Sequence, residues 1–593
     1  MEKNDLMRGG DFLLKQTKAN DVFIPEEFDE EQLMIAQTCE DFLESEVFAN
    51  LDRIDAQEKD LMPSILKKSG DLGLLGISIP GEYDGFDQSF ITSMRANEAI
   101  GSAYSFSVAY MAHTGIGTLP LLYYGNEDQK QKYIPKLASG EMLAAYCLTE
   151  PGAGSDANSG KSKAILSEDG KNYILNGQKM WITNGGFADL LTVFAKIDND
   201  RVLSAFMVET SSEGITISPE EKKMGIKGSS TTQIFFNDVK VPVENLLGKR
   251  GEGFRIALNI LHIGRIKLGG TVLGACKKAI NNSVIYANER KQFGSLISSF
   301  TAIKYKLAEQ VIRTWVAESA VYRATGDVEQ IIQKLIKEGK KKGEANIGGI
   351  AEFAIEAALL KVYGSEALDY VVDEAVQIYG GMGFSSEAPV DRAYRDSRIN
   401  RIFEGTNEIN RLLAVDTTLK KAPKGEFPIF EKAAELLQNL DQYSSTKAPA
   451  SYFEEKAHYV NNFKNAILML IGVANEKLRK ELVKEQEIQM NIADMMMGLY
   501  AAESTLLRIQ KLNSIKGEEA ISYCKNILDI FIYDTSNSIF KAGQDALNSV
   551  VEGEENEKYM NALQTFTQVA GVNIRDARRR IADKLIDDNL YKF

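Results

Sequence analysis

The sequence predicts a mainly helical protein that contains one small β-domain. Apolar residues recur at helical spacing before about residue 140 and again after about residue 250. Between these points they form short runs separated by turn residues, as in strands joined by hairpins. At roughly 150 residues per domain, the 593 residues are enough for about four compact units.

Residues 1–140 are expected to form an N-terminal helical domain. Leu33, Ala36, Cys39 and Leu43 illustrate its spacing, because they follow one another at intervals of three or four residues. The Pro- and Gly-containing stretch 79–85 predicts a loop within this domain.

Residues 141–250 are expected to form the middle β-domain. Its apolar runs are short, at 173–175, 190–195, 203–208 and 233–236, and Asn, Asp and Gly residues lie between them. This pattern is typical of antiparallel strands with tight turns.

Helical spacing returns over residues 251–418, where Val272, Cys276 and Ala279 share one helix face. The run from Thr417 to Pro428 is rich in Lys, Pro and Gly and predicts a linker. Amphipathic helices are expected to continue in a C-terminal extension, residues 419–593.

The composition excludes several classes of function. The chain carries 83 acidic and 69 basic side chains, a formal net charge of −14, which argues against binding to nucleic acid. Its four cysteines form no C-x-x-C pair and its three histidines lack metal-ligand spacing, so we expect neither a disulfide framework nor a metal site. The N-terminus does not resemble a secretory signal, and no run of about 18 apolar residues occurs. We therefore expect a cytoplasmic protein that, if it is an enzyme, uses an organic cofactor.

The first candidate motif is the glycine-containing stretch from Gly152 to Ala157. It fits the G-x-G-x-x-A pattern of dinucleotide-binding folds. That motif requires a following helix, whereas here the chain runs toward a hairpin turn at Asp169 and Gly170. We reject the dinucleotide-binding interpretation. A loop with bare backbone can let a flat ring approach closely, but this segment taken alone would be interpreted as an ordinary loop that ends a strand.

A second segment, Gly177 to Gly186, places Trp181 beside Thr183 in a predicted hairpin. An indole presents a large face to an aromatic cofactor, and a threonine hydroxyl can donate a hydrogen bond to a ring nitrogen. Packing in the core is the alternative for Trp181. Together, residues 146–155 and 177–186 resemble the two flavin-binding signatures of the acyl-CoA dehydrogenase family.

Two further segments match that family in the expected order. Residues 290–294 resemble its Arg-x-x-Phe-Gly segment, which binds the FAD pyrophosphate across a subunit interface, and residues 377–383 resemble its glycine-rich adenine-side loop. An arginine suits a pyrophosphate because its guanidinium is planar and always charged. Without the resemblance, a surface ion pair with Glu289 would be the preferred interpretation of Arg290.

The segment 398–409 resembles the catalytic stretch of the family, and the resemblance makes Glu404 the base. Burial beside an acyl chain would raise the pKa of Glu404 toward the working pH, as proton abstraction from a weak carbon acid requires. Some family members carry the base directly before the arginine that corresponds to Arg265, but here that residue is Gly264. His262 stands where medium-chain members have an aspartate.

The resemblance implies FAD as the cofactor, no metal and a fold of helical, β-barrel and helical domains, with the C-terminal helical extension added. The implied cofactor-binding residues are Tyr146, Leu148, Thr149, Gly154, Ser155, Trp181, Ile182, Thr183, Arg290, Gln292, Phe293, Gln377, Ile378, Gly380, Gly381, Thr406 and Glu408. The implied substrate-binding residues are Ser155, His262, Arg265, Phe403 and Gly405.

The extension makes the chain most similar to the very-long-chain acyl-CoA dehydrogenases. The resemblance implies a homodimer that oxidises acyl-CoA to trans-2-enoyl-CoA in fatty acid β-oxidation and passes electrons to an electron-transferring flavoprotein. It also implies a peripheral membrane contact, which the acidity of the chain does not favour. We expect a preference for long chains, because Ala109, Ala112 and Gly115 are small residues on the helix that should floor the acyl pocket. Two alternatives stay open: an acyl-CoA oxidase-like flavoenzyme and a non-catalytic assembly factor of the same fold.

Overall fold

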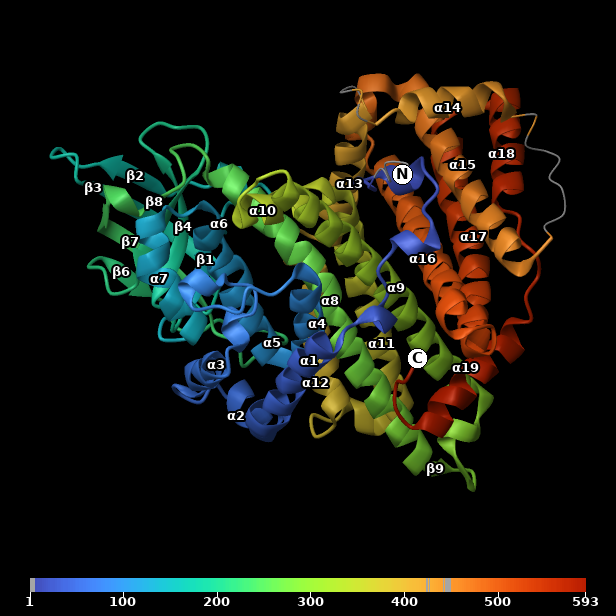
Figure 1. The fold of residues 1–593 in the computed structure, drawn as a ribbon, viewed down its shortest axis with the longest axis horizontal. Coiled ribbons are helices and arrows are strands. Elements are labelled where there is room, and N and C mark those ends of the chain that lie inside the picture. The colour runs from blue at the N-terminus through green and yellow to red at the C-terminus, as the bar shows by residue number, and fades with distance from the viewer. Residues whose placement is uncertain (1–5, 423–424, 426, 441, 443–449) are drawn as a thin grey trace.

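The computed structural model describes residues 6–422, 425, 427–440, 442 and 450–593. The β-domain lies at one end of the molecule, long helices occupy the middle, and the C-terminal helices lie at the other end (Figure 1). The predicted fold class, mainly helical with a small β-domain between helical regions, is confirmed.

The N-terminal helices pack around a core that contains Cys39, Phe42 and Phe106. The first helix begins at a capping box, in which the Asp29 side chain accepts a hydrogen bond from the Gln32 N–H at 2.8 Å. The helices of this region are α1 (Glu30–Phe42), α2 (Leu51–Asp55), α3 (Leu61–Asp71), α4 (Phe90–Ile100), α5 (Tyr104–Met111), α6 (Leu119–Tyr124) and α7 (Glu127–Ser139).

The β-domain is built on one mixed sheet with the strand order β6-β7-β3-β2-β4-β5-β8, and β1 pairs in parallel with β4. The predicted hairpin at Asp169 and Gly170 joins β2 to β3, and Gly170 supplies the left-handed backbone with φ of 69°. The strands are β1 (Ala144–Cys147), β2 (Lys163–Leu166), β3 (Asn172–Thr183), β4 (Leu190–Ile197), β5 (Ser204–Glu209), β6 (Ile215–Ile217), β7 (Thr231–Pro242) and β8 (Leu246–Leu247).

The middle of the molecule is a layer of long helices centred on α8. By length and composition α8 could cross a membrane, but 72% of its most apolar window is buried inside the protein, so it is a core helix. The elements of this region are α8 (Gly253–Glu289), the hairpin β9 (Lys291–Gln292) and β10 (Ser295–Leu296), α9 (Thr301–Lys337), α10 (Lys342–Glu352), α11 (Ala354–Tyr379), α12 (Pro389–Ser397) and α13 (Asn407–Lys421).

The linker expected from Thr417 begins later than predicted, because α13 continues to Lys421. Thr418 is buried, and Lys421 donates from Nζ to the carbonyl of Gly9 at 2.9 Å, so tertiary contacts hold this end of the helix. Lysines also suit the last turn of a helix, where the helix dipole is negative. Residues 423, 424 and 426 of the predicted linker lie outside the described residues.

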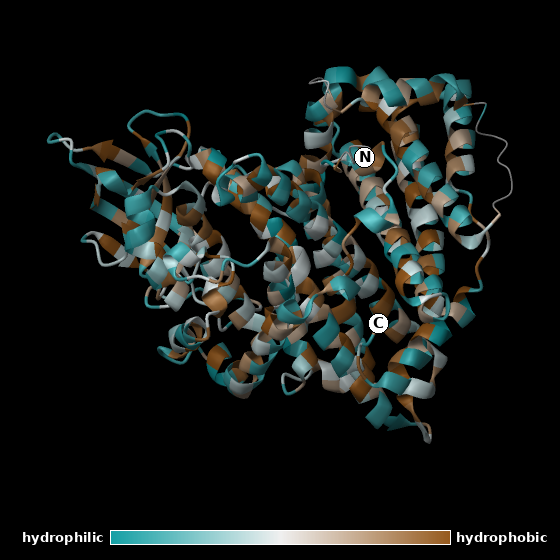
Figure 2. Cartoon of the chain, viewed as in Figure 1, coloured by the Kyte–Doolittle hydropathy of each residue, from teal (hydrophilic) through white to brown (hydrophobic). Residues whose placement is uncertain are grey.

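The C-terminal extension is helical, as predicted. Polar and apolar residues alternate along its helices (Figure 2), as expected for helices that bury one face. The helices are α14 (Ile429–Gln438), α15 (Tyr452–Leu478), α16 (Gln486–Lys516), α17 (Ser522–Val550), α18 (Gly553–Thr567) and α19 (Ile574–Asp588).

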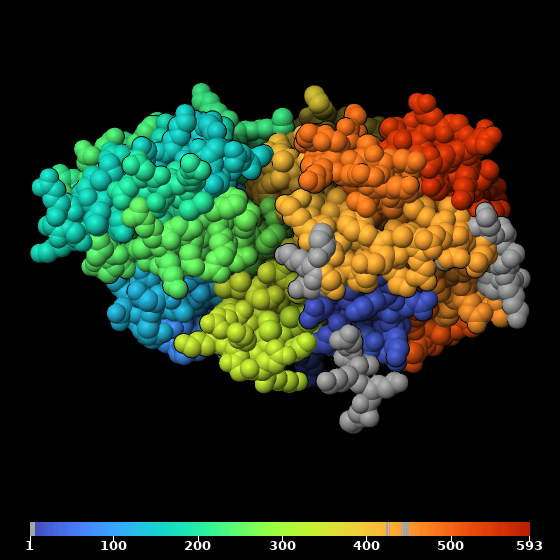
Figure 3. Space-filling view, turned by 90° about the horizontal axis from the view of Figure 1, so that it is seen from above, coloured from blue at the N-terminus to red at the C-terminus, as the bar shows by residue number. Residues whose placement is uncertain are grey.

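The N-terminal segment lies beside the extension rather than beside the β-domain (Figures 1 and 3). Phe12 meets Tyr500 of α16 edge to face at 5.0 Å. Lys464 of α15 donates from Nζ to the Lys15 carbonyl at 2.6 Å. The two ends of the chain therefore stabilise one another.

Arg508 of α16 occupies the centre of this junction. Its guanidinium lies 2.7 Å from Glu26 Oε1 and 2.7 Å from Glu318 Oε2, and its carbon Cζ lies 4.2 Å from the centre of the Trp315 ring. Burial acts to raise the pKa of Glu318, but the charges of Lys277 and Arg508 hold that pKa down at about 2. A buried charge that loses such a partner is strongly destabilising.

We therefore expect Arg508→Met to lower the free energy of unfolding by about 3–5 kcal/mol, the usual effect of breaking a buried ion pair. Urea denaturation followed by circular dichroism measures this change. The control is Arg575→Met, which removes an arginine paired only at the surface with Asp576 and should leave the midpoint unchanged. If both variants unfolded at the same urea concentration, the buried ion pairs of Arg508 would not be needed for stability.

Candidate active site

The turn that leads into α13 carries Glu404, the expected base. Its backbone is left-handed at two successive residues, with φ of 60° at Glu404 and 83° at Gly405. A glycine adopts this conformation readily, whereas a glutamate does so only where its surroundings hold it there. Backbone strain of this kind is typical of functional sites.

Side chains from three helices hold the carbonyl groups of this turn. Arg265 of α8 donates from Nε to the Glu404 carbonyl at 3.0 Å. Lys361 of α11 donates from Nζ to the Gly405 carbonyl at 2.8 Å, and Asn410 of α13 donates from Nδ2 to the same carbonyl at 2.8 Å. These bonds fix the conformation that the backbone alone would disfavour.

The carboxylate of Glu404 lies directly against Gly264 of α8. A β-carbon at position 264 would stand 2.7 Å from Glu404 Oε2 and 2.9 Å from its carboxyl carbon, so the carboxylate would have to move to admit one. The atom Oε2 is buried and has no hydrogen-bond partner among the described residues. The predicted site thus has its single carboxylate where the glycine leaves room for it.

The surroundings of Glu404 tune its protonation. Burial raises the pKa of its carboxyl to about 7, although the charges of Arg265 and Lys361 act in the opposite direction. Burial likewise lowers the pKa of Lys361 to about 7, against the charge of Glu404. A carboxylate whose pKa lies near neutral pH is suited to act as a general base.

Tyr146 approaches the same space from β1. Its hydroxyl is buried without a hydrogen-bond partner among the described residues, and its ring meets Phe194 edge to face at 4.9 Å. Burial, followed by the charge of Glu404, raises the pKa of Tyr146 far above its usual value. The predicted residue Tyr146 and the predicted base therefore belong to one site.

The two segments that resemble flavin-binding signatures lie side by side. The N–H of Met180 on β3 donates to the Thr149 carbonyl at 2.9 Å. Beneath them, buried Lys179 lies 2.7 Å from Glu150 Oε1, and Glu150 Oε2 accepts a hydrogen bond from the Lys161 N–H at 2.5 Å. This ion pair anchors both ends of the glycine loop.

The surface formed by these segments suits a flat ring. Trp181 has a left-handed backbone, with φ of 59°, at an irregularity in the pairing of β3 with β7, and its indole is 53% exposed. Around Gly152 and Gly154 there is open space where a β-carbon would lie. An exposed indole beside bare backbone fits the isoalloxazine ring of FAD. Of the next two residues on β3, Ile182 is buried and Thr183 is partly exposed.

A second group of expected cofactor residues lies elsewhere on the chain. Arg290 follows the last residue of α8, whose 37 residues span roughly 55 Å. The hairpin at β9 lies far from the β-domain (Figure 1), and Phe293 at its tip is 95% exposed. Tyr286 stacks on Tyr379 with ring centres 4.0 Å apart and joins this hairpin to the glycine loop after α11. The residues of this group are Arg290, Gln292, Phe293, Gln377, Ile378, Gly380 and Gly381, and all except Ile378 are exposed.

The other expected residues surround the catalytic turn. Thr406 caps the N-terminus of α13, since its hydroxyl accepts a hydrogen bond from the Ile409 N–H at 3.3 Å. Glu408 is exposed one turn away from Arg411. His262 Nδ1 lies 3.2 Å from an Nη atom of Arg265, and burial with that neighbouring charge lowers the pKa of His262 to about 3. A neutral imidazole at this place can accept a hydrogen bond from the arginine.

Lys361, Asn407 and Asn410 hold the catalytic turn but are not among the residues expected from the sequence. A lone lysine within an apolar stretch of α11 is the signal that points to Lys361, because a buried ammonium needs partners. The two asparagines carry no comparable signal, since their partners are distant in the sequence or are backbone carbonyls.

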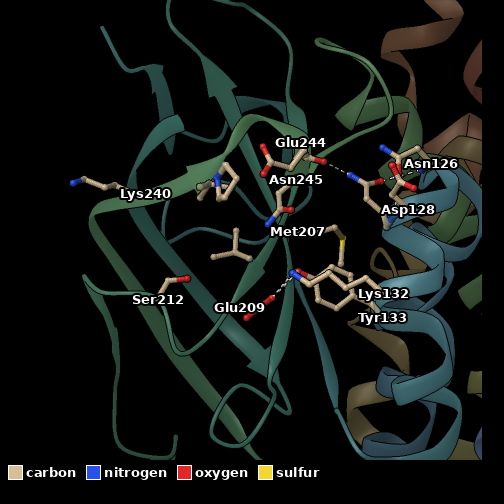
Figure 4. Close-up of a pocket in the computed structure, with 14 residues that line it drawn as sticks. Asn126, Asp128, Lys132, Tyr133, Met207, Glu209, Ser212, Lys240, Glu244 and Asn245 are labelled. Atoms are coloured by element: carbon tan, nitrogen blue, oxygen red, sulfur yellow. Dashed lines mark hydrogen bonds and ion pairs between the residues drawn. The ribbon is translucent and has the colours of Figure 1, made fainter. Parts of the chain in front are cut away.

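A cavity of about 470 Å³ between α7 and the β-domain lies apart from this site (Figure 4). Some of its polar groups are paired with one another, for example Lys132 Nζ at 2.9 Å from Glu209 Oε1 and Gln129 Nε2 at 2.7 Å from the Glu244 carbonyl. None of the expected cofactor or substrate residues lines it.

Comparisons with known proteins agree with this geometry. The chain matches the acyl-CoA dehydrogenase N-terminal domain over residues 29–141, the middle domain over 145–239 and C-terminal domains over 251–418 and 462–565. It is 44% identical over 587 residues to a Bacillus subtilis (strain 168) protein named "Probable acyl-CoA dehydrogenase", covering 99% of each chain. It is 35% identical to the bovine very long-chain specific acyl-CoA dehydrogenase over 84% of this chain and 78% of that one.

A solved acyl-CoA dehydrogenase from Bacillus anthracis in complex with FAD superposes with a TM-score of 0.96 at 45% identity, covering 99% of this chain and 100% of that chain. The match extends through the catalytic turn and the C-terminal extension. The chain therefore belongs to the acyl-CoA dehydrogenase family of FAD-dependent enzymes.

Proposed function

We propose that this protein oxidises long-chain acyl-CoA to trans-2-enoyl-CoA in fatty acid β-oxidation, with Glu404 as the base. The observation that carries the proposal is the buried Glu404 carboxylate against Gly264, with burial holding its pKa near 7. At that pKa the carboxylate can take a proton from the carbon next to the thioester.

In the proposed reaction Glu404 acts through both its side chain and its backbone. Glu404 Oε2 takes the α-proton, and the backbone N–H of Glu404 is the proposed donor to the thioester carbonyl, where negative charge develops. Bound FAD supplies the acceptor for the hydride from the neighbouring carbon. Trp181 shields the ring, Thr183 donates toward it, and Ser155 contacts both substrate and cofactor.

We further propose a homodimer in which each FAD is held by both chains. The support is the separation of the two groups of expected cofactor residues: Trp181 lies at the β-domain, while Arg290 and the exposed Phe293 lie beyond the far end of α8. In such a dimer, the second copy would present its Arg290 to the pyrophosphate of the FAD whose ring lies beside Trp181 of the first copy.

The proposed preference for long acyl chains is based on the helical turn that directly follows α5. Gly115 lies in the π-helical turn Ala112–Gly117, and open space exists where its β-carbon would be. Ala109 is instead buried in the core of the N-terminal helices, and its carbonyl accepts a hydrogen bond from Asn184 Nδ2 at 2.9 Å. The space for a long chain therefore depends on Gly115 more than on Ala109.

As electron acceptor we propose an electron-transferring flavoprotein in the cytoplasm. Relatives that cover most of this chain are named dehydrogenases, which supports an acceptor other than oxygen. Oxygen consumption during turnover would favour an oxidase instead. Purified protein without a flavin absorbance spectrum would favour an assembly factor.

The first prediction concerns Glu404. Glu404→Gln should keep bound FAD but lower the rate of anaerobic flavin reduction by acyl-CoA by about 10²- to 10⁴-fold, as expected when a general base is lost. In the parent enzyme this rate should rise with pH through about 7, because the base must be ionised. The control is Glu481→Gln, on an exposed carboxylate of the extension. A parent-like rate in Glu404→Gln would exclude Glu404 as the base.

The second prediction concerns the glycine that faces the base. Gly264→Ala should lower the rate of flavin reduction by roughly 10- to 100-fold, since the added carbon displaces the carboxylate and small displacements are costly in catalysis. Stopped-flow absorbance measures the rate. In the matched control Gly343→Ala, the new carbon would lie 3.6 Å from its nearest neighbour, an ordinary contact. If both variants react at the parent rate, the contact has no catalytic importance.

The third prediction concerns chain length. Turnover should increase from butanoyl-CoA through octanoyl-CoA to hexadecanoyl-CoA, because longer chains bury more apolar surface in the pocket. Gly115→Leu, which fills the open space, should reduce turnover on the longest substrate most. A maximum at butanoyl-CoA in the parent enzyme would contradict the proposed substrate class.

A further inference from the structure

A chain of polar contacts connects the C-terminal extension to the catalytic turn. It begins at Asp494 on α16, whose Oδ1 lies 2.7 Å from Arg411 Nε on α13. The same guanidinium binds Glu366 on α11 with both Nη atoms, at 2.8 Å and 3.0 Å. One arginine thus ties together the extension and two helices of the active site, in a two-pronged geometry that favours strong binding.

The series of polar contacts continues through Asn407, the first residue of α13. Its Nδ2 donates to Glu366 Oε1 at 3.0 Å, so its Oδ1 faces the other way and lies 2.7 Å from Lys361 Nζ. Lys361 then donates to the Gly405 carbonyl at 2.8 Å, directly beside Glu404. Each partner sets the orientation of the next.

Most members of this series of contacts are buried, which strengthens the hydrogen bonds between them. Lys361 and Asn407 are 0% and 2% exposed, and the Arg411 side chain is 14% exposed. Hydrogen bonds in such surroundings are stronger than at the surface, and an unpaired member would be costly. The two acids are more accessible, since the side chain of Glu366 is 34% exposed and that of Asp494, at the end of the series, is 44% exposed.

We propose that the C-terminal extension braces the catalytic turn through Asp494, Arg411, Glu366 and Asn407, and that Lys361 is the positioning residue on which this brace acts. The inference rests on the proposed function, because it assigns the brace to the turn that carries the base. It gives the extension a role inside the active site of its own chain.

The brace should act on both the position and the charge of Glu404. Lys361 holds the carbonyl next to Glu404 and places a positive charge near its carboxylate. The other charged or titratable groups that face Glu404 are Arg265 on α8 and Tyr146 on β1, and the neutral His262 of α8 contacts Arg265. Lys361 itself also faces Glu408 of α13 and Glu366 of α11.

The first test changes the solvent-exposed end of the brace. Asp494→Asn should lower the rate of anaerobic flavin reduction about 3- to 10-fold, within the range for contacts that couple distant sites. It should also speed amide hydrogen exchange in the peptide that covers residues 404–411. The matched control is Asp545→Asn in α17, an acid of similar exposure paired only with Lys541.

The second test removes the lysine. Lys361→Met should retain flavin but raise the pH midpoint of the reduction rate by roughly one unit, because a nearby positive charge favours the ionised base. Adding Asp494→Asn to Lys361→Met should produce little further loss, since both act through one set of contacts. If the rate of flavin reduction in Lys361→Met recovers at high pH, the loss comes from a raised pKa of Glu404 and not from misfolding.

Equal rates and equal hydrogen exchange in Asp494→Asn and Asp545→Asn would overturn the proposal, as would additive losses in the double variant. If Lys361→Met does not fold, the Asp494→Asn comparison still decides, because that residue is exposed. A parent enzyme whose flavin is not reduced by any acyl-CoA would instead refute the proposed function.

Discussion

The carboxylate of Glu404 lies so close to the backbone of Gly264 that a β-carbon there would stand 2.7 Å from Oε2 and displace it. Oε2 is buried at this contact, and burial raises the pKa of the carboxyl to about 7. The contact also requires the left-handed turn at Glu404 and Gly405, which Arg265, Lys361 and Asn410 hold by their carbonyls. The packing of α8, α11 and α13 therefore sets the chemistry of one side chain.

The wider architecture supports that packing from outside. Arg508 buries ion pairs between the extension, α9 and the N-terminal segment, and Asp494 reaches the start of α13 through Arg411. The extension is thus part of the scaffold of the active site as well as a marker of the subfamily. The expected flavin-binding residues are more widely spread, because Trp181 lies on β3 of the β-domain and Arg290 directly follows α8.

The order of helical and β regions could be predicted because periodicity is local in the sequence. Glu404, Trp181 and Arg290 could be identified because each lies in a contiguous motif. Asn407 and Asp494 could not, since their importance depends on partners dozens of residues away, and Lys361 carries only the signal of a lysine within an apolar stretch. The start of the linker was misplaced for the same reason: residues 417–421 have linker-like composition, yet contacts with the distant Gly9 keep them helical.

The central claim is that burial keeps Glu404 protonated far above the usual pH range of a carboxyl group. Infrared difference spectroscopy of the parent enzyme against Glu404→Gln, titrated without substrate, measures this directly through the band of the protonated carboxyl. We predict that the band specific to Glu404 disappears with a midpoint at about pH 7. A midpoint close to 4.5, the ordinary value for glutamate, would contradict the account.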